Sequence, residues 1–234
     1  MISSEQGKKE IVLPVTFEEY FRSFRLDELK RYLDVTEKYL QKAKSDFETS
    51  ANEQAKKLST ANPNLRAVEI DDILGNDYWQ YAETFPRILR SSFLVSVISL
   101  FENEVAQISQ RIRRVREIPI NLADLNGDLL NKVKMYCKLA GLPISFGNRT
   151  WNEINNYYMV RNCIVHNNGF ISGFRDEKKM IAYAEKKEIV DRLMFLPSIR
   201  PRAIIALSEQ FCEEAIETIQ DFLVELEKKI AKTI

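Results

Sequence analysis

Residues 157–169, YYMVRNCIVHNNG, contain residue types that can take part in catalysis. His166 is the only histidine among 234 residues, and Arg161 stands five positions before it, followed directly by Asn162. An unperturbed imidazole titrates near pH ~6.5, so it can accept or donate a proton at neutral pH. The planar guanidinium of an arginine matches the oxygens of a phosphate and stabilises negative charge on them. The stretch could therefore be a catalytic arrangement, or it could be the polar end of an ordinary core helix.

A helical wheel gives Arg161 a second interpretation. At ~100° per residue, Arg161 falls inside the apolar arc of the helix. Trp151 and Tyr157 lie near the edges of this arc. Burying a lone charge is costly, so such an arginine needs a partner. Glu102, an acidic residue in the otherwise apolar stretch 93–105, is the obvious candidate. These facts alone favour a structural Arg–Glu pair. The arc itself consists of Ile154, Tyr158, Ile164 and Val165.

His166 lies about 140° around the helix from Arg161. The two side chains reach a common point only if the helix loosens at residues 167–169 or if a second copy of the chain supplies another motif. A single histidine at a helix end is more often a cap or a surface residue.

Helical periodicity predicts the elements that must position these residues. A long helix is expected over 16–58, and a linker marked by Pro63 and Gly75 follows it. Pro86 fits the first position of a helix over 86–116, whose apolar middle predicts a central buried helix. A shorter helix is expected over 128–139.

The second half of the chain is expected to continue the bundle. Thr150 and Glu153 have the spacing of a capping box, which would start the motif helix, and residues 167–169 would close it. Residues 177–186 suggest a short helix, and 188–196 could be helix or strand. Residues 203–232 predict an amphipathic helix. Together these elements predict an all-α fold in a single domain over 1–234. This domain would consist of a core helical bundle over 86–232, which contains an insertion at 170–202, and a long extra N-terminal helix.

Composition limits the function classes. Lys+Arg and Asp+Glu are 34 each, so any attraction to nucleic acid must come from a local patch. Three widely separated cysteines predict no disulfide framework or zinc site, which suits a cytoplasmic protein. The polar start does not resemble a signal peptide, and the longest apolar run is far short of ~20 residues, so no membrane association is expected. The carboxylates Asp71 and Asp72 lack a second cluster, and no metal or other cofactor is expected.

The motif Arg161-Asn162-x-x-x-His166 resembles the R-N-x-x-x-H form of the R-x(4–6)-H motif of HEPN domains (higher eukaryotes and prokaryotes nucleotide-binding). The stretch from Ser99 to Glu102, SLFE, is similar to the S-x-F-E stretch on the central helix of several bacterial HEPN families. The resemblance covers about 86–170, with the final helix also in place. The N-terminal helix and the insertion match no motif of the family.

This resemblance implies an up-and-down helical bundle and a metal-independent endoribonuclease that cuts RNA by attack of the 2′-hydroxyl. Carried over, His166 is the general acid or base, Arg161 the phosphate clamp, Asn162 a positioning residue and Glu102 the residue that orients Arg161. The family's site is usually shared between two subunits, which implies a homodimer. Many relatives are toxins or anti-phage effectors, so an antitoxin or another regulatory protein is a possible partner. Asn168 stands where nucleotidylated relatives carry tyrosine, so control by that modification is not supported.

Other candidates have two interpretations. The stretch RIRRVR could bind the RNA backbone or complement the helix dipole, and Asn167 beside the motif is a further RNA-binding candidate. Cys163 suits packing better than nucleophilic attack.

Two alternatives remain for the whole chain. It could be a non-catalytic HEPN-like module that binds RNA, a nucleotide or a partner protein, or a structural protein assembled through its N-terminal helix. The basic candidates of RIRRVR are Arg111, Arg113, Arg114 and Arg116.

Overall fold

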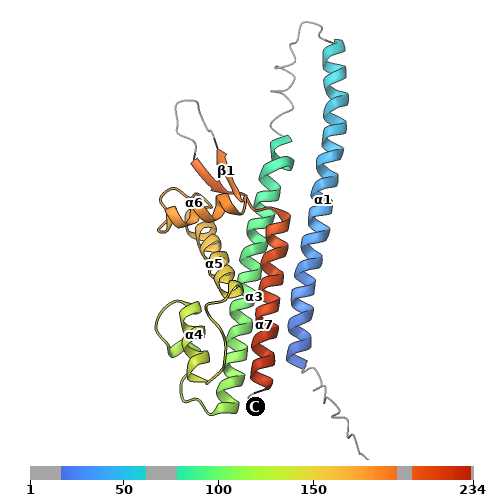
Figure 1. The fold of residues 1–234 in the computed structure, drawn as a ribbon. Helices are drawn as coiled ribbons and strands as arrows, with labels where there is room; N and C mark the ends of the chain where they lie inside the picture. Colours follow the sequence, from blue (N-terminus) through green and yellow to red (C-terminus); the bar gives the residue numbers. More distant parts are fainter. Residues whose placement is uncertain (1–16, 62–77, 194–201, 233–234) are drawn as a thin grey trace, which may run out of the picture.

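The computed structural model describes residues 17–61, 78–193 and 202–232 (Figure 1). Helices account for most of this part, and one two-stranded sheet accompanies them. The all-α prediction is therefore confirmed.

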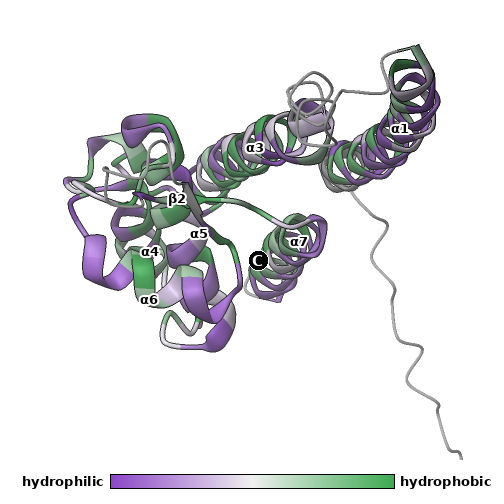
Figure 2. Cartoon of the chain, turned by 90° about the horizontal axis from the view of Figure 1, so that it is seen from above, coloured by the Kyte–Doolittle hydropathy of each residue, from purple (hydrophilic) through white to green (hydrophobic). Residues whose placement is uncertain are grey.

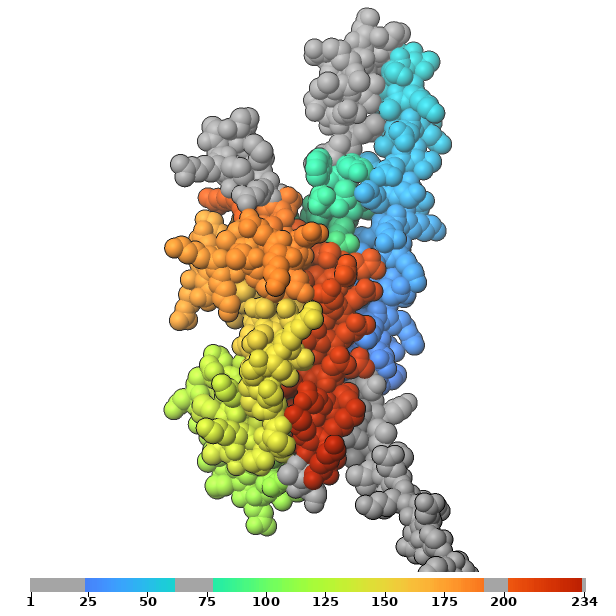
Figure 3. All heavy atoms as spheres, viewed as in Figure 1, coloured from blue at the N-terminus to red at the C-terminus, as the bar shows by residue number. Residues whose placement is uncertain are grey.

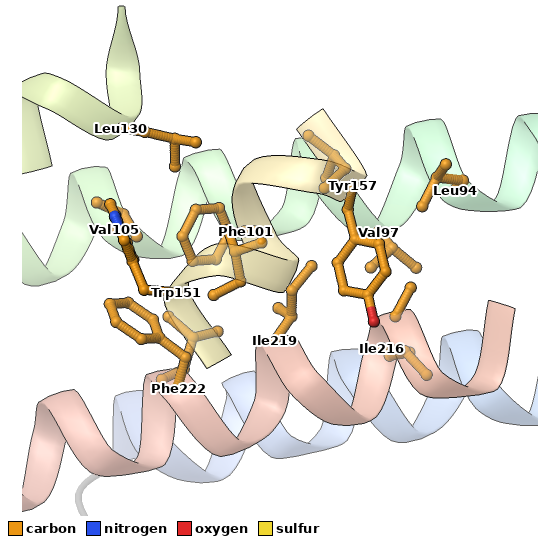
Figure 4. Close-up of a cluster of buried hydrophobic side chains, with 14 of the residues drawn as sticks. Leu94, Val97, Phe101, Val105, Leu130, Trp151, Tyr157, Ile216, Ile219 and Phe222 are labelled. Carbon is orange, nitrogen blue, oxygen red and sulfur yellow. The ribbon is translucent and has the colours of Figure 1, made fainter. Parts of the chain in front are cut away.

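Three long helices lie side by side along the length of the molecule: α1 (Phe17–Ala61), α3 (Phe85–Arg116) and α7 (Glu209–Ala231) (Figure 1). Each repeats apolar residues at helical spacing, so each has a face to bury against its neighbours. The tightest packing joins α3 and α7 to the motif helix α5 (Arg149–Asn167). There Phe101 of α3, Trp151 of α5 and Phe222 of α7 meet (Figure 4).

The smaller elements lie around the two ends of α5. Helix α4 (Leu129–Leu139) is at its beginning, while α6 (Glu177–Lys186) and the strands β1 (Val190–Leu193) and β2 (Arg202–Ile205) are near its end (Figure 1). Seen from above, α4, α5 and α6 lie on one side of α3, and α1 lies on the other (Figure 2). The motif helix and the N-terminal helix therefore belong to opposite sides of the molecule.

Buried ion pairs connect the long helices. Arg90 of α3 holds Glu37 of α1 through two hydrogen bonds, with Nε–Oε1 at 2.6 Å and Nη2–Oε2 at 2.8 Å. Nη2 of Arg25 lies 2.6 Å from Oε1 of the fully buried Glu104, which is again a contact between α1 and α3. A third pair, Arg111–Glu227, joins α3 to α7. Losing one member of such a pair leaves the other buried without its charge partner, so the pairs fix how the helices align.

Most predicted helix boundaries agree with the structure within a few residues. The helix predicted over 16–58 is Phe17–Ala61, and that predicted over 177–186 is α6 itself. Helix α3 begins at Phe85, so Pro86 lies in its first turn as predicted, although helical turns from residue 78, including a π-helical turn η1 (Gln80–Thr84), lead directly into it. Proline lacks an N–H and its ring collides with the carbonyl four residues earlier, which accounts for the wider turn directly before it.

Two predicted helix starts were wrong. The final helix was predicted from residue 203, yet residues 202–205 form β2, and Ser208 caps α7 by accepting from Phe211 N at 3.1 Å. Residues 190–193, left open between helix and strand, pair with β2 as β1. The capping box at Thr150 was wrong as well, because Asn148 caps α5 by accepting from Trp151 N at 2.9 Å. The predicted linker at residues 58–77 lies mostly outside the described residues.

Among the described residues, one continuous helical stretch, Gln80–Arg116, is long and apolar enough by length and composition to cross a membrane. A core helix passes the same test. Helices α1, α5 and α7 pack around this stretch, and Arg90 and Glu104 within it form the ion pairs described above.

Candidate active site

Helix α5 ends in a local structure that its sequence dictates. Asn168 caps it in the left-handed conformation, with φ at 51°, and Gly169 follows with φ at 78°. Asparagine and glycine tolerate this conformation better than other residues. The chain then pairs with β2, because Ile205 N donates to Gly169 O at 2.8 Å and Phe170 bridges Ile204. The end of the motif helix is thus fixed against the sheet.

Arg161 is half-buried on this helix and pairs with its neighbour in sequence. Its Nη1 donates to Oδ1 of Asn162 at 3.0 Å, and Asn162 is itself half-buried. The Nε–H of Arg161 is buried and has no hydrogen-bond partner among the described residues. Part of the guanidinium therefore keeps unused hydrogen-bonding capacity.

The expected pair between Arg161 and Glu102 is not formed. No ion pair joins the two side chains, although both belong to the described part of the chain. Glu102 instead lies near Tyr158, one helical turn before Arg161. Burial raises the pKa of the Tyr158 hydroxyl, and the Glu102 carboxylate raises it further. That hydroxyl is buried, yet the nearby carboxylate does not meet hydrogen-bond geometry with it. Glu102, Tyr158 and Arg161 thus form a loosely bonded polar cluster between α3 and α5.

His166 is exposed in the last turn of α5. Because the helix stays regular through Asn167, it does not loosen in the way that would turn His166 toward Arg161. Within one chain the two side chains remain on different sides of the helix. Val165, which the wheel placed in the core, is 44 % exposed between them. Met159, Val160 and Cys163 complete the buried side instead.

Two residues beside the motif have structural roles. Asn167 donates its side-chain amide to the carbonyls of Phe170 and Ser172, the latter at 3.1 Å, and so holds the following loop. Its donors are therefore not free for RNA in this conformation. Cys163 is buried, its thiol donates to Phe170 O at 3.3 Å, and burial raises its pKa to about 11. A thiol with that pKa stays protonated at neutral pH and is a poor nucleophile.

The basic stretch at 111–116 does not lie beside the motif. Arg111 is occupied by Glu227, whereas Arg113, Arg114 and Arg116 are exposed. Along α3, Arg113 is 25 residues beyond Ile88, which lies next to the end of α5; at 1.5 Å per residue this is roughly 37 Å. The structure therefore places this stretch at the opposite end of the bundle from His166.

A cavity adjoins the end of the motif helix. Its volume is about 490 Å³, and it lies between the first turns of α3, the last turn of α5 and β2. Ile164, Phe170 and Ile204 give it an apolar lining. Arg87, which has no ion pair or hydrogen bond within the described residues, adds a positive charge. Arg87 was not among the predicted site residues, and its position three residues before Arg90 does not indicate that it lines a cavity.

The polar residues that sequence reasoning missed are mainly the buried carboxylates. Glu104, and not Glu102, is the fully buried acidic residue of α3. A signal existed, because Glu104 continues the buried spacing of Val97, Phe101 and Ile108. A further cluster joins α5, α6 and α7, where the Tyr183 hydroxyl donates to Glu153 at 2.9 Å and Lys187 donates to Glu214 at 2.9 Å. Over the described ranges, no three His, Cys, Asp or Glu side chains gather as metal ligands do.

Comparison with known proteins gave no relative. No family model matches the chain, and neither a curated protein nor a solved structure matches it.

Proposed function

We propose that this chain is a HEPN-type, metal-independent endoribonuclease. The proposal rests on the resemblance of Arg161-Asn162-x-x-x-His166 to the family motif. The observation that carries it furthest is the state of Arg161. Arg25, Arg90 and Arg111 each pair with a buried carboxylate on the long helices, whereas no acidic side chain among the described residues pairs with Arg161, whose buried Nε–H also has no hydrogen-bond partner there. An arginine in this state can bind a phosphate without first breaking an ion pair.

The chemistry uses groups of the RNA and of this chain. The 2′-hydroxyl loses its proton to a base and attacks the adjacent phosphorus, and the bond to the 5′-oxygen breaks as that oxygen receives a proton from an acid. The products are a 2′,3′-cyclic phosphate and a 5′-hydroxyl. Arg161 stabilises the charge that develops on the phosphate oxygens, and Asn162 holds one arm of its guanidinium.

A composite site follows from the single histidine. One imidazole can take or give the proton, whereas the reaction needs both steps. Two copies of α5 would bring two histidines, one as base and one as acid. The exposed Val165, between Arg161 and His166, gives this face an apolar contact for a second copy. The homodimer with a shared site is therefore part of the proposal, and equilibrium sedimentation that finds only monomer where RNA is cut would exclude it.

The cellular role comes from the resemblance alone. We propose a cytoplasmic toxin or anti-phage effector that acts on RNA, with an antitoxin or another regulatory protein as its partner. Arrest of growth when wild type is expressed, and normal growth with His166→Ala, would support this role. Equal growth with both proteins would exclude the toxin role. The proposed RNase activity would still be tested separately by the cleavage experiment.

The decisive experiment compares wild type with His166→Ala on labelled RNA in the presence of EDTA. We expect cleavage by wild type, a 2′,3′-cyclic phosphate at the new end, and loss of cleavage in the variant. His166 is exposed and makes no hydrogen bond within the described residues, so its replacement should leave folding unchanged, and circular dichroism checks this. Equal cleavage traces would reject the proposal. RNA binding without cleavage by either protein would favour a non-catalytic HEPN-like module.

A further inference from the structure

Helix α1 has a second apolar face that no described element covers. Its first face packs on the bundle through Leu26, Leu33 and Glu37. On a wheel the second face lies roughly 140° away from the first. Four large side chains lie along it, with exposures from 49 % to 72 %, far above what buried positions show. We call this face the α1 stripe; it consists of Phe24, Tyr32, Val35 and Tyr39.

The stripe is too regular to be scattered surface residues. Tyr32, Val35 and Tyr39 follow a three-then-four spacing, which is the spacing of a helix that packs against another helix. Glu28 precedes them and Lys42 follows them on the same face, both exposed. Such a seam of three apolar positions between an acidic and a basic residue has opposite charges at its two ends.

These charges determine which partner fits. We propose that the α1 stripe binds the α1 stripe of a second copy of this chain in an antiparallel, two-fold pair centred on Val35. Residues equally far before and after Val35 then lie opposite each other. Glu28 is seven positions before it and Lys42 seven after it, so the Glu28 carboxylate of each copy meets the Lys42 ammonium group of the other, and the pair contains this contact twice. A parallel pair would place Glu28 against Glu28 and Lys42 against Lys42, which repel.

The same arrangement gives each tyrosine a cation to face. Tyr32 lies opposite Lys38 and Tyr39 lies opposite Arg31 in the antiparallel pair, since both are equally far from Val35. Lys38 and Arg31 are 72 % and 75 % exposed and pair within their own helix with Asp34 at 2.7 Å and Glu28 at 3.4 Å. Exposed pairs of this kind are weak, so both cations can turn to the rings of a partner copy. Lys42 has no ion pair among the described residues and is available to Glu28. The stripe is thus complementary to itself in both charge and ring contacts.

This contact is separate from the composite site proposed above. Helix α1 lies on the opposite side of α3 from α5 (Figures 2 and 3), so a pair through the stripe leaves both motif helices facing outward. A chain with both contacts would assemble through two different faces. Loss of one contact therefore does not remove the other, and their tests stay independent.

A charge swap tests the proposal. Glu28→Lys should raise the dissociation constant of the stripe contact by about tenfold or more, because it replaces two attractions by two repulsions. Lys42→Glu should do the same, and the double variant should restore association. Gln41→Lys, an exposed change on another face of the helix, is the matched control. Sedimentation velocity over a concentration series gives the constants. Association that is unchanged in both single variants, or not restored in the double variant, would overturn the proposal.

A cysteine at the two-fold centre gives a second readout. Val35→Cys should form a disulfide between two chains under mild oxidation, because the two positions face each other in the pair. The three native cysteines are buried, and Gln41→Cys controls for random collision. Val35 is 58 % exposed, so the change should not disturb folding. Equal crosslinking at positions 35 and 41, or none at 35, would also overturn the proposal.

Discussion

Two kinds of arginine occur on the helices of this bundle. Arg90 contributes two hydrogen bonds to Glu37 and a third, at 3.2 Å, to Leu207 O, and its pKa is raised mainly by the bond to that carboxylate. Arg161 is also half-buried, yet among the described residues its side chain bonds only the neighbouring Asn162, and its buried Nε–H is unpaired there. The Nε–H of Arg25 is unpaired as well, but the guanidinium of Arg25 is neutralised by Glu104. The first kind stabilises the fold, whereas the second is held in place but not neutralised. A buried donor without a hydrogen-bond partner destabilises a fold, and such donors are characteristic of binding sites.

The largest expected effect is on RNA cleavage. Arg161→Ala should lower kcat by about 10²- to 10³-fold, since the developing charge on the phosphate loses a donor. Its effect on unfolding free energy should be small, because no ion pair is broken. Cleavage assays and urea denaturation of the same preparation measure the two effects. A strongly destabilised but fully active variant would reverse the assignment and make Arg161 a structural residue.

Removing a paired arginine should lower the stability of the fold and not the rate of RNA cleavage. Arg90→Met leaves the buried Glu37 carboxylate without its partner and should lower the unfolding free energy by about 3–5 kcal/mol. Replacing both residues by apolar ones, Arg90→Met with Glu37→Leu, should recover much of that loss. Denaturation in urea gives the values. A double variant no more stable than the single one would show that the pair is not the reason for the loss.

A smaller effect is expected at the cavity beside the motif. Arg87→Ala should raise KM for RNA several-fold and leave kcat almost unchanged, because Arg87 would hold the strand and lies away from the polar cluster at Arg161. Arg114→Ala is the matched control, since that side chain is exposed at the far end of α3. If Arg114→Ala has the larger effect, RNA follows the basic stretch and not the cavity.

The smallest effect concerns pH. The hydrogen bond from Lys187 lowers the pKa of Glu214 below its usual value, and partial burial opposes this. Stability from this pair is therefore present above the pKa of the unfolded state, near ~4.3, and is lost as the pH falls through the lower folded pKa. Glu214→Gln should cost less than about 1 kcal/mol at pH 7, because the side chain is 40 % exposed. The difference from wild type should vanish once the pH is below the lowered pKa of the folded state; a difference that stays constant throughout acid titration would exclude the ion pair as its cause.

The sequence predicted the long helices well because their apolar spacing is a local property. Phe17–Ala61 and Glu177–Lys186 match the predicted ranges closely. The start of the final helix was missed, because Ile204 and Ile205 fit a strand and a helix equally well until β1 pairs with them. The capping box predicted at Thr150 and Glu153 was wrong because Asn148, two residues earlier, caps the helix, and Glu153 accepts from Tyr183 of a distant element.

In the candidate site too, the local features were predictable from the sequence and the contacts between distant elements were not. The sequence by itself determined that Arg161, Asn162 and His166 share one helix, that the helix ends at Asn168 and Gly169, and that Arg161 and His166 point to different sides, since backbone geometry fixes all three. Only the tertiary structure decided which carboxylates are paired. It assigned Glu37, Glu104 and Glu227 to arginines and, within the part of the chain that the structure describes, paired no carboxylate with Arg161, because a charge finds its partner across helices that are distant in sequence.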